Sequence, residues 1–367
     1  MDAAKEGCGK RRVWAWRTWV TLESVNLREN ESLAGYTTFG IGGPARYFVE
    51  ARSKDDVAEA VRWADERQMP LFVLGGGSNL LVPDDGYRGL VLKMGIWGTL
   101  QDKSSSPQFF VGAGVSWDSF VDDAIAANCA GIECLAGIPG SVGGTPVQNV
   151  GAYGQEVSET IEAVEVFDRK SAEFRWMENA ECKFRYRESV FNTTERGRYI
   201  VTNVAFALRY DKPTLRYAEL AERFKWKRAT LKKVAEAVRE IRRGKGMVID
   251  PTDADSRSAG SFFKNPILPG AMIVSIAEAA GMDESAVPQW PAESGMVKVP
   301  AAWLLEKAGF VKGYGSGPVR ISSKHTLALT NRGGATFADV AAMQDEIVAG
   351  VFDKFGVRLE REPVVLE

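Results

Sequence analysis

The sequence contains 367 residues, of which 45% are hydrophobic and 26% charged, enough apolar content for two or three domains with cores of their own. This composition excludes that the chain as a whole is a disordered tail or a small disulfide scaffold. With 46 Lys and Arg against 48 Asp and Glu, the formal charge is -2, so the chain as a whole has no basic field that would hold nucleic acid or an anionic membrane. An anionic partner would have to meet a local basic cluster.

The cysteines and the histidine limit the chemistry. Cys8, Cys129, Cys134 and Cys182 are scattered without a CxxC pair, which favours a reducing compartment over a zinc knuckle or a disulfide framework. The sequence has one histidine, His325, so sites that need two or three imidazoles are excluded, and a Ser-His-Asp triad would have to be built on this residue. We expect no metal site.

Residues 1–33 are expected to form a variable N-terminal tail. They include basic residues and three tryptophans, Trp14, Trp16 and Trp19, but they lack the ~7 to 15 residue apolar core of a secretory signal. A targeting or membrane-surface segment is the alternative. Elsewhere no apolar run approaches the ~18 residues of a membrane span, so we expect a soluble protein.

From about Tyr36 to Tyr210 the pattern predicts a strand-rich region. Two helices interrupt it: Ser53 and Asp56 form a capping box before the first, and Ser116 precedes the second. Short β-branched or aromatic runs, separated by Gly and Pro, occur at residues 45–51, 71–77, 89–94, 108–114, 163–169 and 198–208.

After Pro213 the sequence pattern changes from strand-like runs to helical spacing, and we place a domain boundary there. From Thr230, apolar residues recur at helical spacing up to a basic end at residues 242–245. Thr336 caps a further helix that stops at Gly356, and a final strand is expected over about residues 357–366. The class is therefore mixed α and β.

The first glycine-rich loop, residues 74–79, follows a predicted strand. Consecutive small residues let backbone N–H groups converge on an anionic oxygen, as in a phosphate nest. The loop is neither a P-loop, because Gly-Lys-Ser/Thr is absent, nor a dinucleotide fingerprint, because no helical pattern follows. A plain tight turn is the alternative.

The second glycine-rich loop, residues 137–154, has six glycines and two prolines in eighteen residues. Its glycines permit close backbone approach, and Gln148, Asn149 and Tyr153 add hydrogen-bonding and stacking groups. This combination suits a large flat ligand with a diphosphate. A glycine-rich corner between strands is the alternative.

Six motifs have the order and spacing of one enzyme family. They are TTFGIGG (37–43), LFVLGGGSNLL (71–81), AGIPGSVGGTPVQNVGAYG (136–154), CKFRYRESVF (182–191), GSFFKNP (260–266) and LEREP (359–363). On these motifs the chain resembles the UDP-N-acetylenolpyruvoylglucosamine reductases (MurB) from about residue 34 to its C-terminus. AGIPGSVGG and GAYG also occur, in weaker form, in other FAD-linked oxidases, whereas YRES combined with GSFFKNP is specific to the reductases.

The resemblance implies an α+β fold. An FAD-binding region of the vanillyl-alcohol-oxidase (PCMH) type is expected over residues 34–212, in two subdomains of about 34–95 and 96–212. A MurB-type α/β substrate-binding domain would follow over 213–355, and a C-terminal strand over 356–367 would carry a catalytic glutamate.

The resemblance also implies a monomeric cytoplasmic enzyme of peptidoglycan precursor synthesis, with no nucleic-acid or membrane partner. NADPH would reduce non-covalently bound FAD, and the reduced flavin would convert UDP-GlcNAc-enolpyruvate to UDP-N-acetylmuramate. The residues implied in FAD binding lie in the two glycine-rich loops: Gly75, Gly76, Gly77, Ser78, Asn79, Ile138, Pro139, Gly140, Gly143, Gly144, Gln148, Asn149, Gly151, Ala152 and Tyr153.

Three residues match the catalytic positions of the family. Hydride delivery to the enolpyruvyl group leaves an enolate-like charge, which the guanidinium of Arg187 would hold. Ser261, next to two phenylalanines that could keep it dry, matches the general acid. Glu362 matches the third catalytic residue, but Glu360 is a rival, since alternation along a strand puts both on one face. The alternatives are an ordinary strand arginine, a turn serine and two solvated acids.

For the UDP group the resemblance implies Tyr217, Lys245 and Asn265. Tyr217 suggests the subgroup in which a tyrosine-bearing loop closes over the substrate. His325 matches a position close to the nucleotide, although a satisfied structural imidazole is the alternative. Arg242 and Lys245 also sit where cations offset a helix dipole.

Two other functions stay open from the sequence. One is a different FAD-dependent oxidase of the same fold; such enzymes commonly tether flavin through His or Cys, and neither residue lies in the two glycine-rich loops. The other is a flavin-binding regulator with an inactive site.

Overall fold

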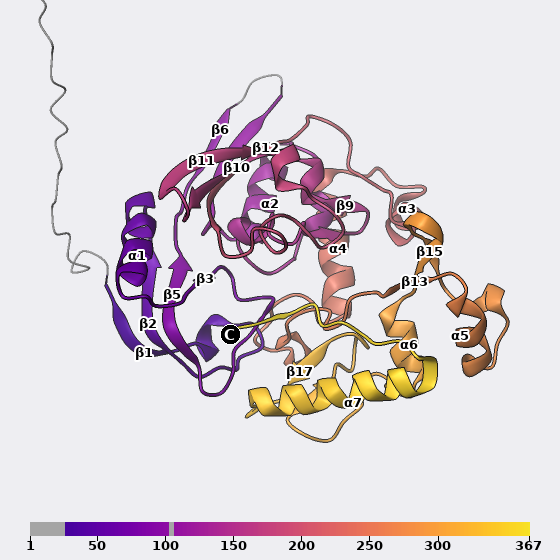
Figure 1. Cartoon of the computed structure of the whole chain (residues 1–367). Helices are drawn as coiled ribbons and strands as arrows, with labels where there is room; N and C mark the ends of the chain where they lie inside the picture. The colour runs from indigo at the N-terminus through magenta and orange to yellow at the C-terminus, as the bar shows by residue number, and fades with distance from the viewer. Residues whose placement is uncertain (1–25, 103–105) are drawn as a thin grey trace, which may run out of the picture.

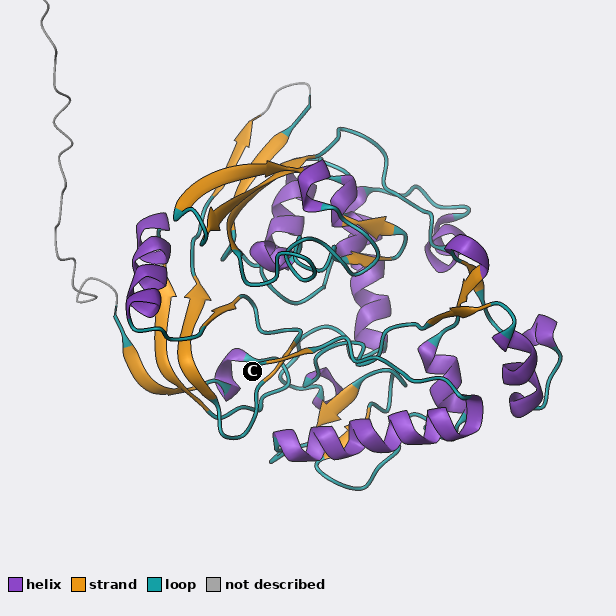
Figure 2. Ribbon diagram, viewed as in Figure 1, coloured by secondary structure: helices purple, strands orange, loops and turns teal. Residues whose placement is uncertain are grey.

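The computed structural model describes residues 26–102 and 106–367, in a mixed α and β arrangement that confirms the predicted class (Figure 1, Figure 2). Residues 1–25, most of the predicted tail, lie outside the described residues. Within the described part of the chain, no helix combines the length and the apolar character needed to cross a membrane.

The first sheet has four strands in the order β1-β2-β5-β3. Three of them, β2, β5 and β3, run parallel, and β1 is antiparallel to β2. Helix α1 (Lys54–Glu66) lies beside this sheet in Figure 1 and begins with the predicted capping box at Ser53. The strands are β1 (Arg28–Ser32), β2 (Pro44–Ala51), β3 (Leu71–Leu74) and β5 (Tyr87–Met94).

Strand β1 corrects the predicted N-terminal boundary, since residues 28–32 belong to the sheet and not to a tail. Its sequence, RENES, is polar and mostly exposed, so it has no apolar alternation to signal a strand. The strand forms because its backbone pairs with β2, from Arg28 opposite Phe48 to Ser32 opposite Pro44.

The second sheet is antiparallel, with five strands in the order β11-β10-β12-β7-β6. Helix α2 (Trp117–Ala126) packs its aromatic face on this sheet: the ring centroids of Phe120 and Phe206 are 4.8 Å apart, and those of Phe120 and Phe109 are 5.6 Å apart. The strands are β6 (Thr99–Asp102), β7 (Gln108–Gly112), β10 (Ile161–Asp168), β11 (Glu173–Glu178) and β12 (Tyr199–Ala207).

Helices α3 (Ala218–Phe224) and α4 (Leu231–Gly244) correct the boundary predicted at Pro213. Their buried residues, among them Leu220, Val234 and Val238, belong to the same core as the two sheets. At Pro213 the sequence pattern changes because the strands of the first two sheets end before it. The apolar stripe of α4 still completes the first core. From the C-terminal part, the second core includes residues only from Ala259 onward.

The C-terminal part forms a second core under the long helix α7 (Phe337–Phe355), which has the predicted capping box at Thr336 and ends at Gly356. Phe39, Ile41 and Leu81 from the first half also pack into this core. Its other elements are β13 (Ile267–Pro269), α5 (Met272–Ala280), β14 (Trp290–Pro291), β15 (Met296–Lys298), α6 (Ala301–Lys307), β16 (Val319–Ile321) and β17 (Leu329–Asn331).

The end of the chain returns to the first glycine-rich loop. Strand β18 (Val364–Val365) pairs in parallel with β4 (Leu80–Leu81), and Arg361 forms an isolated bridge with Phe263. β18 is much shorter than the strand predicted over residues 357–366. Pro363, which lacks an N–H, interrupts the predicted strand. The C-terminus in Figure 1 accordingly lies beside the N-terminal half of the molecule.

Short elements complete the chain. A two-stranded hairpin joins β8 (Gly151–Ala152) and β9 (Gln155–Glu156) within the second glycine-rich loop. Single 3-10 turns occur at Ala34–Tyr36, Glu133–Leu135, Val142–Gly144, Val157–Glu159, Asn179–Cys182, Ala254–Ser256, Glu284–Ala286 and Glu293–Gly295.

Candidate active site

The two glycine-rich loops lie against each other, backbone to backbone. A Cβ added to Gly76 would collide with the Cα of Gly140, and Gly140 itself has a φ of +132°. The hydroxyl of Ser78 donates to the backbone oxygen of Pro139 at 2.9 Å. The two loops, which are distant in the sequence, therefore pack directly against each other through their backbones.

A buried hydroxyl at this junction fits a polar cofactor group. Ser141 Oγ is buried and has no hydrogen-bond partner among the described residues. A Cβ on Gly75 would lie 2.9 Å from it, so the facing loop offers backbone only. Since an unsatisfied buried polar atom is costly, this hydroxyl is suited to a bound group with hydrogen-bonding atoms, as in FAD. Gly143 instead packs against Ala113.

Asn79 links the glycine-rich loops to the C-terminal segment. Its Nδ2 donates to Gln148 Oε1 at 2.8 Å and lies 3.4 Å from the backbone oxygen of Glu362. The first loop, the second loop and the predicted catalytic glutamate thus meet at one amide.

The side-chain amide of Asn149 is fully hydrogen-bonded to other residues of the protein. Its Nδ2 donates to Glu156 Oε2 at 2.8 Å and to the backbone oxygen of Arg185 at 3.0 Å, while its Oδ1 accepts from Ser158 N at 3.1 Å. Both side-chain hydrogens are used, so Asn149 positions the turn that precedes Arg187.

Arg187 and Glu362 form an ion pair at the centre of the candidate site. Arg187 Nε lies 3.2 Å from Glu362 Oε1, yet this nitrogen is buried without an aligned hydrogen bond. Burial raises the pKa of Glu362, although the nearby Arg187 and Lys264 oppose this. Arg187 has a φ of 59°, a conformation that costs a non-glycine residue about 1–2 kcal/mol. Strain of this kind concentrates at functional sites.

The structure separates the two acids that spacing left equivalent. The Glu362 side chain is 13% exposed and faces Arg187. The Glu360 side chain is 77% exposed and lies 3.6 Å from Lys264 Nζ. Glu362 is therefore the acid that is placed within the candidate site.

Ser261 lies next to the segment that holds Glu362. Its neighbour Phe262 is fully buried, donates its N–H to Leu327 O at 2.7 Å and accepts from Glu362 N at 2.9 Å. Ser261 itself is half-buried, and within the described ranges its hydroxyl makes no hydrogen bond. The apolar surroundings and the unused hydroxyl are both compatible with proton donation.

Aromatic and cationic groups gather where the nucleotide is expected. The rings of Tyr153 and Tyr217 are 5.1 Å apart, and Lys245 Nζ lies 5.7 Å from the Tyr153 ring. Burial and the charge of Lys245 lower the pKa of His325 to about 4. The imidazole Nδ1 accepts the N–H of Leu327 at 3.0 Å, so His325 is neutral and also satisfied as a structural group.

Asn265 is held by the backbone of α6, because its Oδ1 accepts the N–H of Ala301 at 2.9 Å. Burial raises the pKa of Tyr186, and the side chain of Asn265 opposes this rise. Lys298 Nζ lies 4.6 Å from the Tyr186 ring. Tyr186 could have been found from its place beside Arg187 in the motif, whereas only the fold brings Lys298 here.

Arg242 has a structural role. Its Nε donates to the backbone oxygen of Gly137 at 3.0 Å and one Nη to that of Met247 at 2.9 Å, so it ties the end of α4 to the second glycine-rich loop. This is more than the offset of a helix dipole that the sequence suggested.

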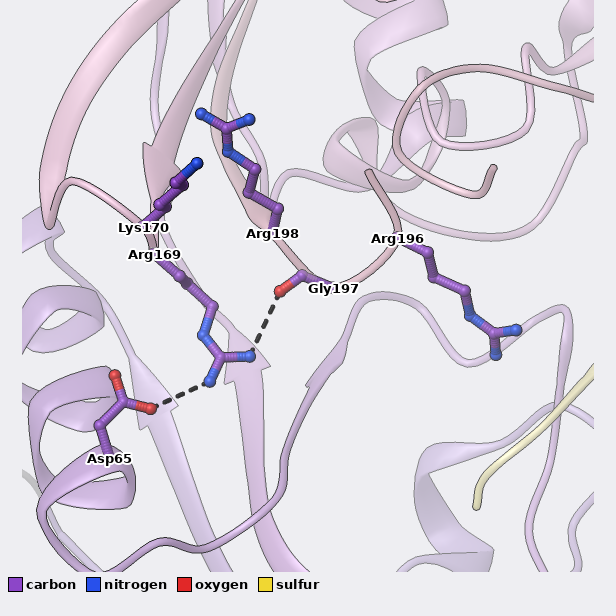
Figure 3. A pocket seen from close by; sticks show the side chains of 6 residues that line it. All are labelled: Asp65, Arg169, Lys170, Arg196, Gly197 and Arg198. Atoms are coloured by element: carbon purple, nitrogen blue, oxygen red, sulfur yellow. Dashed lines mark hydrogen bonds and ion pairs between the residues drawn. The ribbon is translucent and has the colours of Figure 1, made fainter. Parts of the chain in front are cut away.

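A separate open pocket of about 480 Å³ contains none of the predicted site residues (Figure 3). Arg169 donates there to Asp65 at 3.0 Å and to Gly197 O at 3.2 Å. Arg198 is paired with Asp168. Because none of the residues of the candidate site lines this pocket, we do not assign it to the reaction.

Comparisons with known proteins follow the same division of the chain. An FAD binding domain model matches residues 45–176, and a model of the UDP-N-acetylenolpyruvoylglucosamine reductase C-terminal domain matches residues 250–366. The UDP-N-acetylenolpyruvoylglucosamine reductase of Thermobifida fusca is 47% identical, with 94% of this chain and 99% of the relative covered. That of Streptomyces coelicolor is 48% identical, with 94% and 92% covered.

A solved structure shows the same fold over nearly the whole chain. The crystal structure of the UDP-N-acetylenolpyruvylglucosamine reductase from Thermus caldophilus superposes with a TM-score of 0.63 at 28% identity, covering 94% of this chain and 99% of that one. The paired glycine-rich loops, the FAD binding domain and the reductase relatives define an FAD-dependent oxidoreductase. The chain belongs to the UDP-N-acetylenolpyruvoylglucosamine reductase family.

Proposed function

We propose that the chain reduces the enolpyruvyl group of UDP-GlcNAc-enolpyruvate with electrons from NADPH, giving UDP-N-acetylmuramate for peptidoglycan precursor synthesis. The observation that carries the proposal is that the predicted catalytic residues lie together, next to both glycine-rich loops. Arg187 and Glu362 meet at 3.2 Å, Ser261 adjoins the same backbone pairing, and Asn79 joins this group to both glycine-rich loops.

The two loops are the proposed FAD site. Gly76 and Gly140 allow close backbone approach, Ser141 offers an unpartnered buried hydroxyl, and Asn79 and Gln148 form the edge toward the catalytic residues. When bound there, FAD supplies the hydride that reduces the enolpyruvyl double bond. Binding is expected to be non-covalent.

Arg187 is the proposed anchor of the substrate carboxylate. A guanidinium can hold a carboxylate through two nitrogens, and its fixed charge stabilises the enolate-like charge that develops on the neighbouring carbon. Glu362 orients Arg187, and the burial that raises its pKa also suits it to share a proton with the substrate carboxylate. Apart from the ion pair, Arg187 Nε has no partner among the described residues.

Ser261 is the proposed proton donor to the carbon that bears the ether oxygen. A serine hydroxyl is a weak acid in water, but it can donate to a strongly basic carbanion that is held close and dry. Phe262 and Phe263 are both buried and flank the serine on one side. Its hydroxyl is not committed elsewhere in the described ranges.

Tyr217, Lys245, His325 and Asn265 are the proposed substrate-binding residues. Lys245 would offset the diphosphate charge and Tyr217 would close over it, as in the tyrosine-loop subgroup. His325 is expected to contribute as a neutral hydrogen-bonding group, because its pKa lies near 4. The substrate-binding part would combine the C-terminal core with Tyr217, which precedes α3, and Lys245, which follows α4. We further propose that the enzyme is monomeric and cytoplasmic.

Product analysis tests the proposal. Purified chain, NADPH and UDP-GlcNAc-enolpyruvate should yield one equivalent of NADP and a sugar nucleotide heavier by two hydrogens. NADPH oxidation that consumes only oxygen and leaves the enolpyruvyl group intact would reject it.

A further inference from the structure

A short basic segment, residues 225–233, joins α3 to the first turn of α4. It contains five cations, Lys225, Lys227, Arg228, Lys232 and Lys233, and no Asp or Glu. All five residues are exposed. In a chain with a formal charge of -2, this is the kind of local cluster that an anionic partner would need.

Most of these cations are uncompensated. Lys225 Nζ lies 3.5 Å from Glu222 Oε2, but the other four cations form no ion pair within residues 26–102 and 106–367. Arg223, just before the segment, shows the contrast, since it pairs with Glu240. Like charges held close together repel one another, so the arrangement favours binding of a negative surface.

An exposed tryptophan stands at the start of the segment, between two of its lysines. Trp226 is 89% exposed, and Lys225 Nζ lies 5.9 Å from its ring centroid. An indole ring has an apolar body and one polar N–H, and for this reason tryptophan is enriched at the interface between lipid headgroups and acyl chains. Lysine and arginine can extend their apolar stems beside it while their charges stay among the headgroups.

We propose that the basic segment binds the surface of an anionic lipid bilayer, with Trp226 at headgroup depth and the cations against lipid phosphates. No other large apolar side chain of the segment is exposed, whereas a protein interface needs a cluster of anchors around its centre. A fluid lipid surface accepts a single ring and adapts to the spacing of the charges. The contact is peripheral and reversible, and it revises the expectation of no membrane partner.

Vesicle co-sedimentation of the full-length, FAD-loaded chain tests the proposal. We expect binding to vesicles that contain equal parts of phosphatidylglycerol and phosphatidylcholine, and none to phosphatidylcholine alone. Binding should fall as salt is raised, because the screening length shrinks from about 10 Å at 0.1 M to about 3 Å at 1 M. The double variant Lys227→Glu/Arg228→Glu should weaken binding at least about tenfold, and Trp226→Ala about tenfold.

Matched variants supply the controls. Trp97→Ala removes another exposed indole, and Lys170→Glu/Arg196→Glu reverses two cations of the pocket in Figure 3. Both should bind vesicles like the unmodified chain. All variants should keep bound flavin and NADPH-dependent turnover, which shows that they are folded.

Two results would overturn the proposal. One is the absence of binding to anionic vesicles, or equal binding by the unmodified chain and the charge-reversed variant. The other is a single-stranded oligonucleotide that binds through Trp226 and Arg228 while vesicles do not, which would make the segment a nucleic-acid site.

Discussion

Acid should destabilise the folded chain through His325. Burial and Lys245 lower the pKa of this imidazole from the ordinary ~6.5 to about 4. As pH falls, the unfolded chain therefore binds the proton first. The contribution of His325 to stability is complete above about pH 6.5 and is lost progressively toward pH 4. A proton on Nδ1 would also face the Leu327 N–H, which now donates to it at 3.0 Å.

The magnitude follows from the two pKa values. Between pH 7 and pH 5, linkage gives a loss of about 2 kcal/mol in the free energy of unfolding from this residue alone. Urea denaturation of the FAD-loaded chain at both pH values measures the total change. His325→Gln keeps an acceptor for the Leu327 N–H but does not titrate. The free energy of unfolding of this variant should therefore fall by about 2 kcal/mol less between pH 7 and pH 5 than that of the unmodified chain. An identical pH dependence in the two proteins would refute the reasoning.

Three further predictions concern the candidate site. Ser261→Ala should leave NADPH oxidation nearly intact and slow the substrate half-reaction by at least ~10²–10⁴, measured by stopped flow; equal loss in both halves would contradict its role. Glu362→Gln should lower turnover at least tenfold, on the order expected for a charged partner in the site, whereas Glu360→Gln should change steady-state rates less than twofold. Gly76→Ala should reduce the flavin bound per chain, read from visible absorbance, while Gly35→Ala, which has open space around it, should not; equal flavin content in both variants would argue against the proposed FAD site.

Local chemistry explains which elements could be predicted from the sequence. The capping boxes at Ser53 and Thr336 are set by residues three positions apart, and both helices begin where the pattern indicates. The polar strand β1 has no such signal, because its backbone pairing with β2 forms it. Likewise, the apolar stripe of α4 predicts a helix but does not reveal the core that it joins.

The same limit applies to the site. Motifs placed Arg187, Ser261 and Glu362 as candidates, but spacing alone could not separate Glu362 from Glu360. The distinction depends on the turn that carries Arg187, which lies far away in the sequence and covers only one of the two acids. Lys298 has no sequence signal, since it reaches Tyr186 only through the packing of the C-terminal domain.

An anaerobic two-step flavin titration tests the central claim most directly. The purified chain should be yellow, NADPH should bleach its flavin, and UDP-GlcNAc-enolpyruvate added without oxygen should restore the colour in a one-to-one ratio. A flavin that stays bleached after the enolpyruvyl sugar nucleotide is added, or a chain that takes up no FAD, would contradict the account.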